Sequence, residues 1–280
     1  MKRLGVMFDR DLPPERLVPF AEALDETSVD DLWVVEDLGW TGGVSAAATA
    51  LAVTSRLRVG IGITPAPLRN PMLLAMELGN LARVHPGRLA AGIGHGVQGW
   101  MRQVGAAVPS PLALLEETIT SVSALLRGET VTLDGRAVHL DGVSLVHPPA
   151  EPPPVLAGVK GPRSLALSGR VAQGTIVPEG LGPADLPEII SQIGAGPEHE
   201  LVVFTFLRVG ADASGDIPPI VEGQAGFLGV APEQVAMASG TPEAAAEHVK
   251  ELWAAGAGTV TVRPIGDDPL GQVAALLSAL

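Results

Sequence analysis

The stretch 90-AAGIGHGVQGWM-101 contains a formal match, at 94–99, to the G-x-G-x-x-G dinucleotide fingerprint. In a Rossmann domain this fingerprint closes the first strand of the fold and opens the first helix. An acidic residue about 20 positions further on then binds the ribose. Glu116 has this spacing, but it lies inside an amphipathic helical pattern rather than at a strand end. The strands around the motif must therefore decide which fold the glycines belong to.

Short apolar runs alternate with amphipathic stretches on both sides of the motif. The runs are rich in Val, Ile and Leu without polar alternation, as in strands buried on both faces. The predicted strands are 4–8, 32–36, 57–63, 88–93, 155–159, 174–178, 201–209 and 259–262, and the predicted helices are 13–24, 44–55, 71–84, 111–126, 162–170, 183–193, 242–255 and 270–280. Eight such units predict an α/β fold of the (β/α)8 TIM barrel type. The glycine motif then follows the fourth strand, not the first.

We expect one barrel domain over residues 1–280, because no repeat and no second-domain boundary interrupts the alternation. Two segments do not fit the alternation of strands and helices, 128–154 and 210–240, and we predict that they are insertions at barrel loops. The first of them begins with a β-hairpin pattern that turns at Asp134-Gly135.

Composition and charge limit the class of protein further. The chain of 280 residues is 46% hydrophobic and carries a net charge of −13, without a Lys/Arg-rich block, which argues against nucleic-acid binding. It has no cysteine, and its histidines lack metal-ligand spacing, so we expect no metal site. No apolar run reaches the length of a membrane span, and 4–8 is too short for a signal peptide. We expect a cytoplasmic protein without a membrane partner.

The segment 158-GVKGPRS-164 follows the fifth predicted strand and opens a helix. Proline suits the first turn of a helix, where the free N–H groups also bind anions. The pattern indicates either a phosphate site or an ordinary turn with two solvated basic side chains. In the first case the cofactor-binding residues are Gly158, Val159, Lys160, Gly161, Pro162 and Arg163.

Four stretches resemble the luciferase-like monooxygenase superfamily, whose members are barrels that use FMN or the deazaflavin coenzyme F420. They are 31-DLWVVEDLGW-40, 59-VGIGITPAPLRNP-71, 81-LARVHPGRLAAGIGHG-96 and 153-PPVLAGVKGPRSLALSGRVAQGTIV-177. The third is the most specific, because a Pro-Gly-Arg-Leu turn runs into a strand that ends in Gly-x-Gly-x-Gly. The resemblance covers most of residues 1–180. It favours a third interpretation of the glycine motif over a Rossmann turn or a turn without a ligand. In this interpretation, small residues let a flat cofactor lie against the backbone.

The resemblance implies where the cofactor ring lies. It places a β-bulge with a cis peptide at Gly62-Ile63, followed by Thr64, behind the ring; an ordinary strand is the alternative. It also places the turn residues Gly94, Gly96 and Val97 against the cofactor.

Two positions depart from the pattern of the family. In many deazaflavin-dependent relatives, the acid after the second strand is followed by His, whereas this chain has Glu36 and Asp37. One of these carboxylates is a candidate proton donor, or one caps a helix while the other is solvated. The second departure is Ala172-Gln173-Gly174 in place of Ala-Asp-Gly, from which we expect only a change in loop structure.

Three further residues are site candidates. His95 lies in the glycine turn next to the implied ring site and is a candidate proton donor, or else a turn residue bonded to the backbone. Trp40 and Trp100 lie in predicted mouth loops, where they form an aromatic wall for substrate or simply pack.

The leading hypothesis is an oxidoreductase that moves a hydride between F420 and an organic substrate. The alternatives are an FMN-dependent monooxygenase fed by a partner flavin reductase, and a non-catalytic flavin-binding barrel. The resemblance also implies a homodimer that associates through barrel helices.

Overall fold

Eight parallel strands close into a barrel in the computed structural model, which describes residues 2–210 and 217–280. The strands run in the order β1, β2, β3, β4, β7, β8, β9 and β11, and β11 pairs with β1 to close the ring. Their bounds are Arg3–Met7, Asp31–Val34, Arg58–Pro65, Leu89–Gly94, Val155–Gly158, Gly174–Val177, Glu200–Val209 and Thr259–Pro264. Each ends within two residues of its predicted end, and the (β/α)8 prediction is confirmed.

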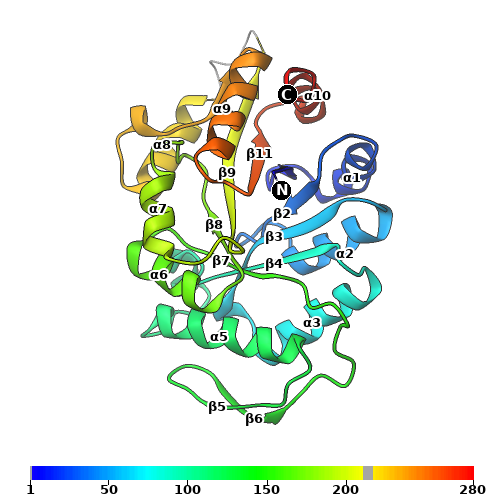
Figure 1. The fold of residues 1–280 in the computed structure, drawn as a ribbon, viewed down its shortest axis with the longest axis vertical. Helices are drawn as coiled ribbons and strands as arrows, with labels where there is room; N and C mark the ends of the chain where they lie inside the picture. The colour runs from blue at the N-terminus through cyan, green and yellow to red at the C-terminus, as the bar shows by residue number, and fades with distance from the viewer. Residues whose placement is uncertain (1, 211–216) are drawn as a thin grey trace.

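Helices follow the strands and surround the barrel (Figure 1). They are α1 (Leu17–Asp25), α2 (Gly43–Val53), α3 (Pro71–Val84), α5 (Pro111–Leu126), α6 (Pro162–Val171), α7 (Leu186–Ile193), α9 (Pro242–Ala254) and α10 (Pro269–Ala279), with 3-10 turns η1 (Pro14–Arg16), η2 (Ala66–Leu68) and η3 (Pro232–Gln234). Several begin with a proline that lacks the N–H a helix start leaves unpaired. Asn70, Thr241 and Asp268 cap α3, α9 and α10 with side-chain oxygens. The prolines predicted these helix starts, and the structure adds the three caps.

Three elements were missed in the predicted loops: the helices α4 (Gln98–Gln103) and α8 (Ile217–Leu228), and the strand β10 (Ala238–Gly240). The first helix is too short to show a helical period. Pro218 and Pro219 near the start of α8, with Gly223 and Gly226 inside it, give the segment low helix propensity, although its apolar residues recur at helical spacing. Residues 211–216 of the predicted insertion 210–240 lie outside the described residues.

The predicted hairpin is confirmed. Strands β5 (Val131–Asp134) and β6 (His139–Val143) pair antiparallel around the turn at Gly135. Figure 1 shows the hairpin outside the ring of helices, next to α5. The rest of the predicted insertion 128–154 leads from the hairpin to β7.

The interior of the barrel is filled below its mouth by two aromatic rings. Trp33 and Phe204 are buried and meet edge-to-face, with ring centroids 5.4 Å apart. A Cβ at Gly60 would lie 2.4 Å from the Trp33 ring, and one at Gly62 would lie 2.5 Å from the Phe204 ring. These glycines therefore make room for the rings, which form a floor under the C-terminal ends of the strands. No helix among the described residues is long and apolar enough to cross a membrane.

Candidate functional site

The bulge predicted in the third strand is present at the mouth of the barrel. The peptide Gly62-Ile63 is cis, and the register of β3 against β4 shifts between Ile61 and Thr64. Gly62 and Ile63 are partly exposed although Ile61 and Thr64 on either side are buried. The bulge thus turns this piece of backbone toward the open end of the barrel.

Two glycines of neighbouring strands hold the side chain of Ile63. A Cβ at Gly158 would lie 2.2 Å from Cγ2 of Ile63, and one at Gly94 would lie 2.9 Å from its Cδ1. The two glycines pair with each other across β4 and β7. Both were predicted to contact the cofactor, but the space above them is taken by Ile63. The result is an apolar shelf, half-exposed and set on three adjacent strands.

Glu36 is held by three donors rather than left free. Nη1 and Nη2 of Arg69 both donate to its carboxylate, Nη2 at 2.9 Å from Oε2, and the Gly43 N–H donates to Oε2 at 2.7 Å. Arg69 also pairs with Glu77 at 3.1 Å. Burial opposes the charge on Arg69, but these carboxylates outweigh it and raise the pKa of the guanidinium. Glu36 therefore ties the end of β2 to the start of α2 and to the loop after β3.

Asp37 lies beside an aromatic assembly at the same rim. Its carboxylate pairs with Arg10, whose guanidinium carbon lies 4.5 Å from the ring centroid of Trp40. The Trp40 Nε1–H donates to Asp11 at 2.9 Å, and the rings of Trp40 and Trp100 lie 6.1 Å apart. Trp100 stands on α4, not in a loop as predicted, because the glycine turn leads straight into that helix. The two predicted aromatic residues are indeed neighbours.

His95 is half-buried at the end of β4. Its Nδ1 lies 3.1 Å from the carbonyl oxygen of Gly96, which can only accept, so we assign the ring proton of neutral His95 to Nδ1. No described residue bonds Nε2, which is then the acceptor nitrogen. Gly96 has φ +68°, in the left-handed region that favours glycine, and Gln98 donates to the His95 carbonyl at 3.0 Å. The turn thus fixes the ring while leaving one nitrogen available.

The predicted phosphate segment opens α6 as expected. The Gly161 N–H donates to Oγ of Ser164 at 3.2 Å, and Pro162 stands at the first helical position. Arg163 is exposed at this helix start. Lys160 differs from the expectation, since its ammonium donates to the carbonyl of Phe227 on α8 and lies 4.2 Å from that ring. Burial by these contacts lowers the pKa of Lys160. It would reach a phosphate only by leaving Phe227.

Sequence reasoning missed a charged cluster at the mouth. Arg263, at the end of β11, bonds Asp9 at 2.8 Å and lies 3.6 Å from Glu179 and 3.8 Å from Asp11. Its guanidinium carbon lies 5.6 Å from the Phe206 ring centroid. Burial opposes its charge, but the surrounding carboxylates raise its pKa. The cluster could have been found from the sequence, because Asp9, Glu179 and Arg263 each directly follow a predicted strand.

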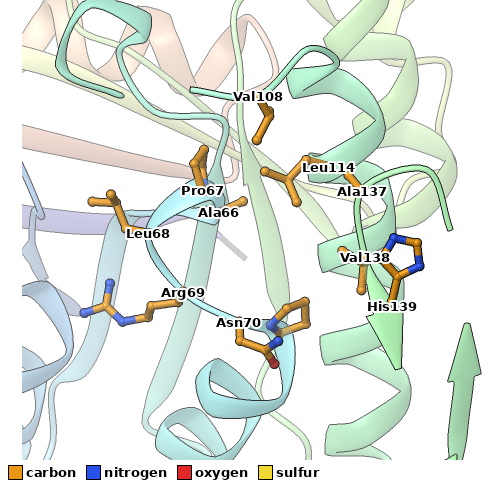
Figure 2. Close-up of a pocket in the computed structure, with 11 residues that line it drawn as sticks. Ala66, Pro67, Leu68, Arg69, Asn70, Val108, Leu114, Ala137, Val138 and His139 are labelled. Atoms are coloured by element: carbon orange, nitrogen blue, oxygen red, sulfur yellow. The ribbon is translucent and has the colours of Figure 1, made fainter. Parts of the chain in front are cut away.

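Two cavities open beside the mouth. One, of about 410 Å³, lies between the loop after β3, α5 and the hairpin, and Figure 2 shows Arg69 pointing away from Leu114 and Val138. The other, of about 460 Å³, lies between the first residues of α5, the hairpin turn and the start of α6. Neither is lined by Ile63 or His95, so both lie outside the shelf.

Comparison with known proteins supplies the family. The model of a family described as "Luciferase-like monooxygenase" matches residues 2–214, well over half of the chain. The fold and site define a parallel barrel with a bulged third strand at its mouth. The chain belongs to the luciferase-like monooxygenase family.

Curated relatives and solved structures agree with this assignment. The chain is 28% identical to a 5,10-methylenetetrahydromethanopterin reductase of Methanolobus tindarius over 69% of this chain and 58% of the relative. It is 28% identical to an F420-dependent glucose-6-phosphate dehydrogenase of Nakamurella multipartita, over 61% of this chain and 54% of the relative. The chain thus spans little more than half the length of these relatives.

Two solved structures show the same fold at low identity. An F420-dependent secondary alcohol dehydrogenase with an F420-acetone adduct has a TM-score of 0.84 at 18% identity, covering 100% of this chain and 98% of the other. The oxygenating constituent of 3,6-diketocamphane monooxygenase from Pseudomonas putida, in complex with FMN, has a TM-score of 0.74 at 16% identity, covering 99% and 97%.

Proposed function

We propose that this protein is an oxidoreductase that transfers a hydride between coenzyme F420 and an organic substrate. One observation carries the proposal: the Ile63 side chain lies over Gly158 at the end of β7, and the α6 helix start follows that same strand. A flat ring packs on an apolar surface, and a phosphate binds the N–H groups of a helix start. The described residues therefore fit a cofactor with a ring at one end and a phosphate at the other.

F420 is proposed ahead of FMN because named curated relatives are F420-dependent enzymes. The FMN-bound monooxygenase of the same fold supports FMN as the second candidate. In that case the protein would be a monooxygenase supplied by a partner flavin reductase. A barrel that binds the cofactor without turnover is the third candidate, and it requires that no hydride donor or acceptor reacts.

The residues of this chain have distinct proposed roles, while the cofactor supplies the hydride chemistry. Gly62, Ile63 and Thr64 support the ring, and the turn Gly94 to Val97 borders it. Gly158 and Val159 end the strand below the shelf, and the phosphate lies at Gly161, Pro162 and Arg163, with Lys160 in reach once released. Trp40 and Trp100 form a wall against substrate.

Proton transfer is assigned to His95. Its Nε2 takes a proton when substrate is oxidised and returns it in the reverse direction, since its Nδ1 proton is held by Gly96. Glu36 and Asp37, predicted as catalytic, are proposed to act as positioning residues. Their partners Arg69 and Arg10 link them to the mouth loops and to Trp40.

The phosphate assignment is tested by Gly161→Asp, which should abolish F420 binding. The nearest atom to an added Cβ is Oγ of Ser164 at 3.7 Å, so the variant has room to fold. The new carboxylate would cap α6 and exclude the phosphate by charge. Gly99→Asp is the control, because nothing lies within 4 Å of a Cβ there. Fluorescence titration that finds Gly161→Asp within about twofold of wild type rejects the site.

A homodimer is proposed as the assembly. It is supported by the outer face of α3, where Leu73, Met76 and Val84 are 48%, 52% and 63% exposed. Light scattering should give about twice the chain mass of 28.7 kDa. A mass of one chain at micromolar concentration contradicts the proposal.

A further inference from the structure

The cavity of about 460 Å³ beside the α6 helix start carries two arginines from separate elements. Arg163 belongs to the first turn of α6, and Arg136 belongs to the turn of the β5–β6 hairpin. The remaining walls come from the segment that leads into α5 and from its first turns: Pro109, Ser110, Pro111, Leu112, Ala113 and Glu116. The chain has 18 basic and 31 acidic residues, so two arginines in one cavity, neither paired with an acid in the described part of the chain, call for an explanation.

Neither guanidinium has an acidic partner among the described residues. The one acid in the cavity wall, Glu116, bonds Arg170 at 3.2 Å and so has a cation of its own. Like charges that face one cavity repel each other, and the repulsion is relieved by an anion placed between them. The cavity therefore has the charge of an anion site, on a protein that is acidic elsewhere.

The hairpin turn is fixed in place. The carboxylate of Glu117 on α5 accepts the N–H groups of Arg136, Ala137 and Val138, each at 2.8 Å. Burial opposes ionisation of Glu117, but these three N–H groups hold its pKa below the ordinary value. A Cβ at Gly135 would lie 2.6 Å from Oε2 of Glu117, so only glycine allows this approach. Arg136 is thus carried to the cavity by a turn that α5 anchors.

Arg163 connects the cavity to the proposed phosphate site, because it lines the cavity and also lies in the first turn of α6. An anionic chain that continues beyond a phosphate on α6 would enter the cavity. Coenzyme F420 carries such a chain, a phosphodiester extended by glutamates, whereas FMN ends at its phosphate. We infer that the cavity between the starts of α5 and α6 binds the glutamate chain of the cofactor through Arg136 and Arg163.

This inference rests on the proposed function, and the test separates the two. F420, FMN and the ring-and-ribityl fragment of F420, which lacks phosphate and glutamates, are titrated against wild type, Arg136→Gln and Arg136→Glu. Binding is read by deazaflavin or flavin fluorescence, without turnover. We expect Arg136→Gln to weaken F420 about fivefold, the scale of one exposed ion pair, and Arg136→Glu to weaken it further. FMN and the fragment should bind all three proteins alike.

Arg16→Glu is the matched control. Arg16 is exposed and follows β1, which lies opposite β7 in the barrel, and the change in charge is the same. Its F420 affinity should stay within twofold of wild type at physiological salt. If Arg16→Glu loses as much F420 affinity as Arg136→Glu, the effect comes from net charge and the inference is overturned.

Other outcomes also decide. If wild type binds F420 and both Arg136 variants bind it equally well, the cavity inference is wrong and the proposed function stands. If the Arg136 variants bind the fragment as weakly as they bind F420, relative to wild type, Arg136 acts on the ring site and the inference is again wrong. If wild type binds FMN and not F420, both the inference and the proposed function fail.

Discussion

The two ends of the barrel each carry a cluster of charges, and the clusters differ in how tightly they are bonded. At the base, Asp31 is wholly buried and accepts from Arg3 and Arg58, with Arg58 Nη2 at 2.6 Å. Arg58 also bonds Glu200 at 2.7 Å, and Thr259 donates to Glu200 at 2.6 Å. These residues stand at the starts of β1, β2, β3, β9 and β11. Every charged group of this cluster at the base is therefore bonded to another member of the cluster.

The Arg263 cluster at the mouth is bonded less completely. Arg263 bonds Asp9 at 2.8 and 3.2 Å, but its distances to Glu179 and Asp11 are 3.6 and 3.8 Å. In parallel barrels, the N-terminal end serves stability and the C-terminal end carries function. The contrast is therefore between the Asp31–Arg58 cluster and the looser Arg263 cluster, since Glu36 and Asp37 at the mouth are bonded as closely as the residues at the base.

The largest effect is expected at the base. Arg58→Met leaves the buried carboxylate of Asp31 and that of Glu200 without their shared cation, which costs about 3–5 kcal/mol of unfolding free energy. Urea unfolding followed by circular dichroism measures it. Arg127→Met is the control, since Arg127 pairs with Glu129 at the surface and both are about half exposed, at 49% and 52%. A loss below about 1 kcal/mol for Arg58→Met would remove the distinction between the ends.

The next effect concerns catalysis at the mouth. His95→Ala should lower kcat roughly 10²-fold, the usual scale for removing a general acid or base, with little change in F420 affinity. Glu36→Gln should act more on binding, because it loosens Arg69 and the start of α2. Single-turnover kinetics at saturating cofactor gives both values once a substrate is found. A wild-type rate for His95→Ala together with an inactive Glu36→Gln reverses the two roles.

Arg263→Met makes the same substitution at the mouth as Arg58→Met makes at the base. We expect a loss of only about 1–2 kcal/mol, because two of the three ion pairs of Arg263 are long. Unfolding in urea under identical conditions compares the two variants directly. Equal losses at both ends would show that the longer distances do not reflect weaker bonding.

The smallest effect is a pH dependence that arises near the base. N–H groups of Ser55, Arg56 and Leu57 outweigh burial and lower the pKa of Asp25 from 3.8 to about 2. Burial also opposes ionisation of Glu200, but Arg58 lowers its pKa. Carboxylates with lowered pKa stabilise the fold above their unfolded pKa, and that stability is lost as pH falls toward about 2. Asp25→Asn should flatten this acid slope in unfolding curves from pH 5 to 2, and an unchanged slope contradicts the assignment.

Much of the fold could be predicted from the sequence, because buried parallel strands and proline-started helices leave local patterns. The eight strands and the starts of α3, α5 and α6 show this. The helix α8 was missed because its two prolines and two glycines are typical of a loop, although its apolar residues recur at helical spacing. The places of His95, Trp40 and Trp100 at the mouth of the barrel could be predicted from their position after strands, and their roles stay predictions. The partners of Glu36 and Lys160 were not, because Arg69 and Phe227 approach them only through the fold.

We propose that the mouth of this barrel binds F420 through the Ile63 shelf and the phosphate site at the start of α6. A side-by-side titration of the wild-type protein with F420 and FMN tests it most directly, by fluorescence at fixed physiological salt. We expect saturable one-to-one binding of F420, at least about tenfold tighter than that of FMN, a difference of about 1.4 kcal/mol. Tighter binding of FMN, or no binding of either compound, would contradict it.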